Sequence, residues 1–160
     1  MAEPGWRVLL LLAATFRAGV EVAHAEVTDG GHPEARPLHG FALQAIGAHG
    51  CTIAQLGQRL GVTKQAAAKT AATLERLQYV QRAEVPGDRR SVLLTRTRRA
   101  EEMLAASEVA FERTVAEWRH RLGDARYDAM VEALVELTGD APTVDLPGLL
   151  APRAGPPSTT

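Results

Sequence analysis

The sequence has few of the residues that mark several common classes of protein. It contains 160 residues with a single cysteine, Cys51, and aromatic residues make up only 4% of the chain. One cysteine excludes an intrachain disulfide and gives no sign of an oxidising compartment, so we expect a soluble protein of the cytoplasm. The apolar fraction of 46% is rich in Ala and Leu, which favours a mainly α-helical fold.

The chain also lacks the short motifs of common enzymes. It has no nucleophile elbow, no glycine-rich phosphate loop and no zinc-protease helix. None of its histidines forms a pair with the tight spacing of metal ligands. We therefore expect no catalytic residue, no cofactor and no metal ion. The histidines are His24, His32, His39, His49 and His120.

Long hydrophobic runs are missing as well. The longest, residues 8–14, is far shorter than the ~18 residues that a membrane-spanning helix needs. Together with the small residues near position 24 it imitates a secretory signal, but Arg17 and Glu21 interrupt the pattern. Helical spacing instead predicts an amphipathic helix over residues 3–26. Its apolar face consists of Leu9, Ala13, Phe16 and Val20.

Turn-forming and capping residues divide the next part of the chain into short helices. The turn formers at 28–33 end the first helix, and Pro37 begins a second that lasts until Gly47. Thr52, with Gln55 in the capping-box position, predicts the start of a third helix.

A fourth helix follows the third after only three residues. Gly61 ends the third helix, and Thr63 caps a helix that runs to about Leu77. Two short helices with this spacing predict a helix-turn-helix. Residues 79–85 and 91–95 then read as two strands around a turn at 86–90, which completes a winged helix.

The C-terminal third predicts two further helices and a tail. A long helix covers residues 97–122, Gly123 breaks it, and a shorter helix covers 124–137. Residues 139–160 hold five of the nine prolines, which indicates a disordered tail. We therefore expect one domain over residues 1–138.

Charge is distributed unevenly between these elements. Residues 51–100 hold ten basic and three acidic residues, a net charge of +7, while the rest of the chain carries −8. Such an asymmetry suggests a polyanionic partner, and the predicted helix-turn-helix makes double-stranded DNA the leading hypothesis.

The outward face of the fourth helix is the predicted recognition surface. Gln65 is our candidate for reading a base, because an amide can contact adenine N6 and N7 together. Lys64 and Lys69 are expected to contact phosphates, and Ala66 and Ala68 thymine methyl groups. An ordinary solvated helix face is the alternative. The candidates on this helix are Thr63, Lys64, Gln65, Ala66, Ala68, Lys69 and Thr73.

The hairpin turn carries the remaining candidates, Asp88, Arg89 and Arg90. A basic turn that projects beyond two strands can enter a narrow minor groove, where the negative potential favours arginine. Asp88 fits such a turn if it pairs with a neighbouring arginine, and a plain solvated turn is the alternative.

Residues 52–104 resemble the winged-helix region of the multiple antibiotic resistance regulator (MarR) family. The motifs that carry this resemblance are Ala54-Gln55-Leu56-Gly57, Leu60-Gly61-Val62-Thr63-Lys64-Gln65, Leu74-Glu75-Arg76-Leu77 and Asp88-Arg89-Arg90 followed by Leu93-Leu94-Thr95. The order of elements extends the resemblance to about residue 138.

The resemblance implies a homodimeric transcriptional regulator, in which residues 1–27 and 97–138 pair the subunits and residues 38–96 bind DNA. Such proteins usually repress by occupying a pseudo-palindromic operator, and a small aromatic or phenolic effector often releases them. For Phe16 and Trp118, core packing or dimer contact is the alternative interpretation. The residues on elements that the family places around its effector pocket are Phe16, His39, Phe41 and Trp118.

The sequence departs from the family pattern at several positions. Gln78 stands where a helix-ending glycine is common, so it must adopt a left-handed conformation or end the helix differently. Residues 97–100 read Thr-Arg-Arg-Ala in place of Thr-Glu-Lys-Gly, and Ala66 and Ala68 replace larger or polar residues. Cys51 precedes the third helix, whereas peroxide sensors of the family carry theirs in the first, so we interpret it as a buried spectator thiol.

Two other functions remain open at this point. The same helices can form a winged-helix module that binds a protein and not DNA, with an incidental basic face. A secreted enzyme would require cleavage of the N-terminal segment. Neither alternative accounts for the arginines of the hairpin.

Overall fold

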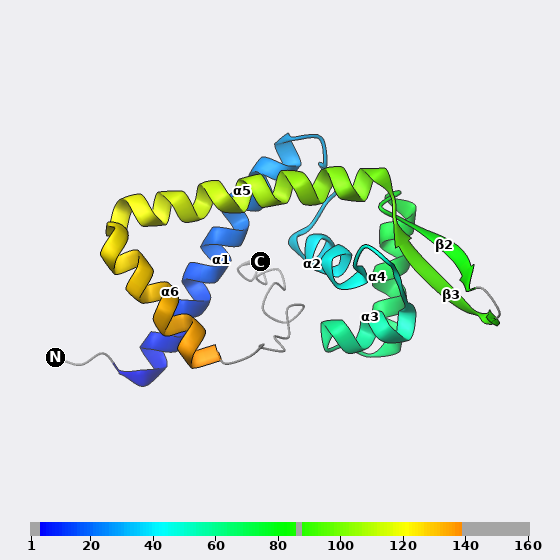
Figure 1. Cartoon of the computed structure of the whole chain (residues 1–160), viewed down its shortest axis with the longest axis horizontal. Helices are drawn as coiled ribbons and strands as arrows, with labels where there is room; N and C mark the ends of the chain where they lie inside the picture. Colours follow the sequence, from blue (N-terminus) through cyan, green and yellow to red (C-terminus); the bar gives the residue numbers. More distant parts are fainter. Residues whose placement is uncertain (1–3, 86–87, 139–160) are drawn as a thin grey trace, which may run out of the picture.

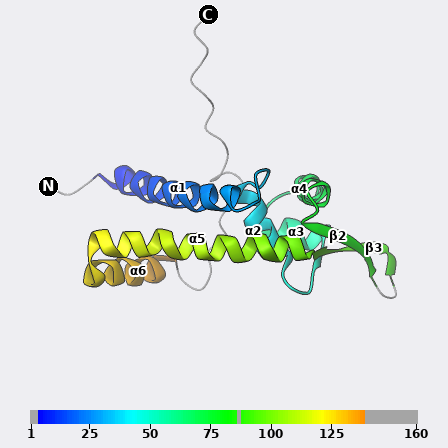
Figure 2. The same cartoon turned by 90° about the horizontal axis from the view of Figure 1, so that it is seen from above.

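The fold has a helical scaffold at one end and a winged helix at the other. The computed structural model describes residues 4–85 and 88–138. Helix α5 runs along most of the molecule, α1 crosses it and packs against it, and α2, α3, α4 and the β-hairpin lie around its N-terminal end (Figure 1, Figure 2). The elements in order are α1 (Gly5–Asp29), α2 (Pro37–Ile46), β1 (Cys51–Thr52), α3 (Ile53–Leu60), α4 (Lys64–Arg76), β2 (Val80–Val85), β3 (Asp88–Arg96), α5 (Arg98–Leu122) and α6 (Asp124–Thr138). The predicted mainly α winged-helix fold is confirmed.

The helices of the winged helix begin where their capping residues predict. The Thr52 hydroxyl accepts the Gln55 N–H at 3.3 Å while the Gln55 side-chain oxygen accepts the Thr52 N–H at 2.9 Å, which is the predicted capping box. The Thr63 hydroxyl accepts the Ala66 N–H at 3.1 Å and starts α4. Between the two helices Gly61 adopts φ 68°, so α3 ends in a left-handed residue.

The sheet contains one strand more, and a shorter turn, than the sequence predicts. Strand β1 pairs with β3 in the register Cys51↔Leu94, so the order is β1-β3-β2. Gly50, at φ 77°, makes this pairing possible, because a Cβ there would lie 2.5 Å from the Leu94 oxygen.

The hairpin corrects the predicted position of the turn. Strand β3 begins at Asp88, so Asp88, Arg89 and Arg90 belong to a strand and not to the turn. The register passes from Glu84↔Val92 to Val85↔Asp88, which leaves residues 89–91 as an irregular insertion in β3. The alternation of apolar and polar residues does not predict this bulge, which brings Val85 opposite Asp88. Pro86 and Gly87 lie outside the described residues.

The main core lies under the winged helix. Its fully buried side chains come from α2, α3, α4 and β3, and the large ones include Leu43, Leu56, Leu74 and Leu94. The scaffold end is different, because the N-terminal half of α1 leaves Trp6 65% and Leu9 68% exposed. Residues 139–160, for which the sequence predicts a disordered tail, lie outside the described residues.

Helix α1 as a whole is more hydrophobic than its longest uninterrupted apolar run suggests. An 18-residue window of α1 has a mean hydropathy of 1.5, and 17% of this window is buried. By length and composition the helix is therefore long and apolar enough to cross a membrane. The uninterrupted run was a poor measure, because single charged residues break a run without lowering the mean much. The mostly buried core helix of a soluble protein and a signal sequence near the N-terminus pass the same test, and α1 packs against α5.

Candidate nucleic-acid interface

One face of α4 is exposed over its first half. Lys64, Gln65 and Lys69 are exposed, whereas Ala67 and Ala71 are fully buried against the core. This division follows from the spacing of the small residues, because positions three and four apart share a helix face. Of the other candidates on this helix, Thr63 and Ala66 are exposed and Ala68 and Thr73 are half-buried.

Two of these candidates have hydroxyl groups that are already used locally. The Thr63 hydroxyl caps the helix, and the Thr73 hydroxyl donates to the Lys69 carbonyl oxygen at 3.1 Å. The polar side chains of this face that remain available to contact a partner are therefore Lys64, Gln65 and Lys69. The first turn of α4 contains no acidic residue, so its unpaired N–H groups add positive potential at the same end.

The angle between α3 and α4 depends on a close approach at Gly57. A Cβ at Gly57 would lie 3.1 Å from the Val62 oxygen and 3.5 Å from the Ala67 Cβ. The Val62 N–H also donates to the Gly57 oxygen at 2.9 Å. The glycine therefore lets the turn fold back on α3 and presents α4 to solvent.

The far end of α4 is fixed by a buried polar group. Gln78 adopts φ 60°, the left-handed alternative foreseen for it, and the Tyr79 N–H donates to the Leu74 oxygen at 2.8 Å. Tyr79 Oη lies 2.9 Å from His32 Nδ1, and the Arg99 guanidinium lies over the Tyr79 ring, 5.2 Å from its centroid.

The protonation states in this group follow from its burial. Burial, followed by the Arg99 charge, lowers the pKa of His32, and burial raises the pKa of the Tyr79 hydroxyl. The hydroxyl thus stays protonated and the imidazole neutral at pH 7, and the two share one hydrogen bond. This bond ties the loop after α1 to the residues that follow α4.

The wing lies next to α4, and its arginines are only partly described. Arg82 of β2 pairs with Glu75 of α4 at 2.9 Å, which joins the hairpin to the helix. Asp88, Arg89 and Arg90 are placed as backbone in β3, and their side chains lie outside the described residues. The predicted pairing of Asp88 with an arginine is thus untested.

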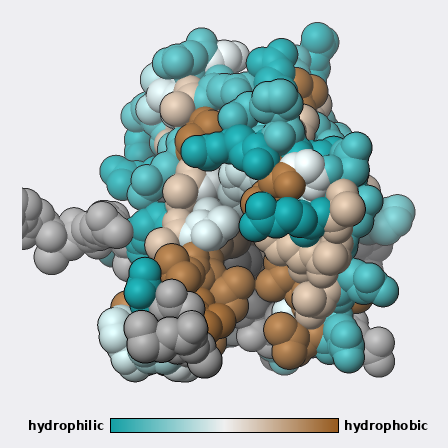
Figure 3. Space-filling model, turned by 90° about the vertical axis from the view of Figure 1, so that its left-hand side faces the viewer, coloured by the Kyte–Doolittle hydropathy of each residue, from teal (hydrophilic) through white to brown (hydrophobic). Residues whose placement is uncertain are grey.

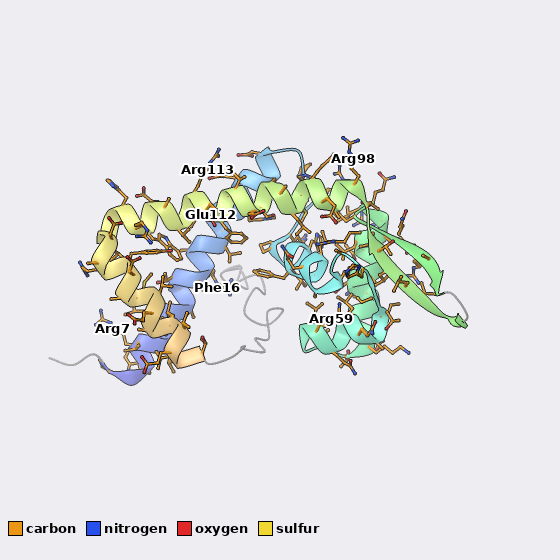
Figure 4. All side chains as sticks on the ribbon, viewed as in Figure 1. Arg7, Phe16, Arg59, Arg98, Glu112 and Arg113 are labelled. Carbon is orange, nitrogen blue, oxygen red and sulfur yellow. The ribbon has the colours of Figure 1, made fainter. Side chains whose placement is uncertain are left out.

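Acidic residues neutralise much of the basic third of the chain. Arg76 pairs with Glu34 at 3.8 Å, Arg96 with Glu101 at 2.9 Å and Arg98 with Glu102 at 2.9 Å. Figure 4 shows Arg98 on the side of the molecule away from Arg59. By contrast, Lys64 and Lys69 form no ion pair with any residue in the described ranges, so the exposed positive charge concentrates on α4.

A cavity of about 410 Å³ lies between α1, α2 and α5. Of the four candidates for an effector pocket, Phe41 lines it, and Phe16, His39 and Trp118 are not among its lining residues. Figure 4 shows Phe16 on the middle of α1. Trp118 contacts the backbone of α1, because a Cβ at Gly19 would lie 2.7 Å from its ring. The lining residues that sequence reasoning missed include His24, Arg36, Glu108, Phe111 and Glu112.

His39 lies on α2, which borders the cavity, but its ring is used within the helix. Its Nδ1 accepts the Arg36 N–H at 3.1 Å, so it caps α2 from inside the helix. The side chain is 6% exposed, and burial, with the charges of Arg36, His24 and Arg76, lowers its pKa to about 4.

Cys51 is 1% exposed, and burial raises the pKa of its thiol. This fits the interpretation of a spectator thiol. Within residues 4–85 and 88–138, no group of three His, Cys, Asp or Glu side chains could hold a metal ion.

Comparisons with known proteins agree with this geometry. Residues 36–91 match the model of the MarR family. No curated protein matches the chain. Solved structures similar to it include the transcriptional regulator Tm0710 from Thermotoga maritima, with 24% identity, a TM-score of 0.59 and coverage of 86% of this chain and 94% of that one. RV1404 from Mycobacterium tuberculosis has 20% identity, a TM-score of 0.70 and the same coverage. Wild-type MarR from E. coli has 16% identity, a TM-score of 0.67 and coverage of 87% and 100%.

Proposed function

We propose that this chain, which belongs to the MarR family of DNA-binding winged-helix transcriptional regulators, acts in the cytoplasm as a homodimeric repressor of a pseudo-palindromic operator. The observation that carries the proposal is the exposed N-terminal half of α4, where Lys64, Gln65 and Lys69 face solvent without ion pairs to described residues. A similarly folded mutant of E. coli MarR has been solved in complex with operator DNA.

The division of roles on α4 follows from side-chain chemistry. Gln65 has both a donor and an acceptor, so it can read the edge of an adenine. Lys64 and Lys69 offer charge without base-specific geometry and serve the phosphates. Arg89 and Arg90 are proposed to enter the minor groove beside the wing, with Asp88 shaping the hairpin.

The scaffold end supports the homodimer. Exposed apolar side chains of α1 and α6 gather there, and Figure 3 looks onto this end, with brown hydrophobic groups over its lower half. Apolar side chains gathered on one end of the molecule in this way mark an interaction site. A second copy would cover it and set two α4 helices about one DNA turn, roughly 34 Å, apart. The exposed side chains are Trp6, Val8, Leu9, Leu10, Leu11, Leu12, Val131, Val135 and Leu137.

The cavity between α1, α2 and α5 supports release by a small effector. It lies between the scaffold and the winged helix, and Phe41 and Phe111 in its wall suit an aromatic or phenolic molecule. An occupant there would bias the position of α2 relative to α5, and with it the spacing of the two recognition helices.

Fluorescence anisotropy with DNA selected by the full-length protein from a random pool tests the proposal. We expect Gln65→Ala to reduce the preference for selected over random DNA, and Lys69→Ala to weaken binding to both. Arg126→Ala, an exposed change on α6, is the control for a lost charge and should leave both affinities unchanged.

The competing function is a winged-helix module that binds a protein and not specific DNA. It predicts that selection enriches no sequence and that Gln65→Ala changes nothing. Equal losses on selected and random DNA would keep DNA binding but remove Gln65 from base reading.

A further inference from the structure

We propose that the cavity between α1, α2 and α5 takes a small aromatic cation, such as a quaternary ammonium carried on a benzyl group. The inference rests on the proposed function in one respect, because it names the charge of the effector. Among the aromatic ligands that the walls suit, it selects a positively charged one over a neutral phenol or an aromatic anion.

The cavity is large enough for a compact ligand with an apolar body. Its volume of about 410 Å³ lies within the range of small-molecule sites. Val20 and Ala23 of α1 and Met103 and Leu104 of α5 form apolar walls and are buried. The ligand must therefore bury hydrocarbon, which excludes a bare inorganic ion.

Two carboxylates give the cavity its charge. Glu108 and Glu112, both exposed to solvent, lie one turn apart on the face of α5 that lines it, so like charges are close neighbours. Within the described residues neither forms an ion pair or a side-chain hydrogen bond. The adjacent Arg113 does not neutralise them, because its guanidinium pairs with Glu26 at 3.1 Å.

The basic side chains in the wall do not balance these carboxylates. Arg36 contributes one positive charge and forms no salt bridge with Glu108 or Glu112 in the structure. Burial is the main cause that lowers the pKa of His24, so this imidazole is neutral at pH 7 and above. The cavity thus carries two negative charges against one positive charge.

The aromatic side chains match the same ligand. Phe41 and Phe111 both line the cavity, and Phe111 remains 39% exposed although it lies on the inner stripe of α5. A ring face attracts a cation, and a quaternary ammonium has a low cost of desolvation compared with a primary amine. An aromatic carboxylate would instead meet two carboxylates and a single arginine.

NMR titration of the full-length protein without DNA tests the proposal with two probes of similar size, benzyltrimethylammonium and phenylacetate. We expect the cation to bind at least about tenfold more tightly than the anion. The double variant Glu108→Gln/Glu112→Gln should lose this preference. Glu117→Gln, on the same helix but outside the cavity, should keep it, and circular dichroism verifies that each variant is folded.

Three results would overturn the proposal: tighter binding of phenylacetate, no binding of the cation up to millimolar concentration, or unchanged cation affinity in the double variant. The titration contains no DNA, so its outcome is separate from that of the proposed function. If the protein binds the cation but selects no DNA sequence, the proposal for the cavity stands and the proposed function as a regulator is wrong. If it selects DNA but does not bind the cation, only the proposal of a cationic ligand is wrong.

Discussion

Acid should destabilise the protein through His39, the third residue of α2. Its Nδ1 accepts the Arg36 N–H, so the imidazole must be neutral at that atom to cap the helix. Protonation removes the acceptor and places a charge in a site that is 6% exposed, close to Arg36. Burial and the neighbouring charges accordingly lower the pKa of His39 to about 4.

The direction and size of the effect follow from proton linkage. In the unfolded chain a histidine has a pKa near 6.5. Between pH 6.5 and 4, His39 is therefore protonated in the unfolded state and neutral in the folded state. The contribution of His39 is complete above pH 6.5 and is lost as pH falls toward 4. At ~1.4 kcal/mol per pKa unit the full loss is about 3 kcal/mol, of which about 2 kcal/mol is reached by pH 5.

Urea unfolding of the wild type and His39→Gln at pH 8 and pH 5 measures this loss. Glutamine is the conservative choice because Gln55 already caps α3 in this way, accepting the Thr52 N–H at 2.9 Å. Between the two pH values the free energy of unfolding of the wild type should fall by about 2 kcal/mol more than that of the variant. All other titrating groups are common to both proteins and cancel, so equal losses would refute the assignment.

Three further substitutions test the local geometry, each by urea unfolding. Gln78→Gly should raise the free energy of unfolding by about 0.5–1 kcal/mol, since a left-handed residue favours glycine; a decrease would contradict the cost assigned to φ 60°. Gly50→Ala should lower it by about 2–3 kcal/mol, because the new Cβ meets the Leu94 oxygen at 2.5 Å, and no change would mean that β1 does not pair as described. Tyr79→Phe should cost about 1–2 kcal/mol through the lost bond to His32, and His32→Ala in that background should then add less than it does alone.

The features predicted well from the sequence are those determined by neighbouring residues. Thr52 with Gln55 and Thr63 with Ala66 form their capping bonds within three residues, so the pattern of side chains contains the whole interaction. The buried stripe of small residues on α4 is local for the same reason. The left-handed conformation of Gln78 could also be predicted as one of two alternatives, because a helix that ends without glycine has only a few ways to end.

The features missed depend on contacts between distant parts of the chain. Strand β1 has only two residues and exists because Cys51 meets Leu94, which no local period reveals. The start of β3 at Asp88 likewise depends on a register shift set by pairing with β2. The cavity combines α1, α2 and α5, so the sequence could identify Phe41 but not its association with Glu108 and Glu112.

The basic residues of segment 51–100 divide into two groups, and the salt dependence of DNA binding should show it. Of the eight whose side chains the structure describes, six have structural partners: Arg59 donates to the Ala45 oxygen at 2.7 Å, Arg99 lies over Tyr79, and Arg76, Arg82, Arg96 and Arg98 form the ion pairs described above. Lys64, Lys69, Arg89 and Arg90 remain for DNA, eight charges in a homodimer. If each neutralises one phosphate, the slope of log affinity against log salt is about −7; if all ten bound, it would be about −18. A slope near the larger value would show that the six partnered arginines also leave their partners and contact phosphates on binding. A slope close to zero would remove the electrostatic contact altogether.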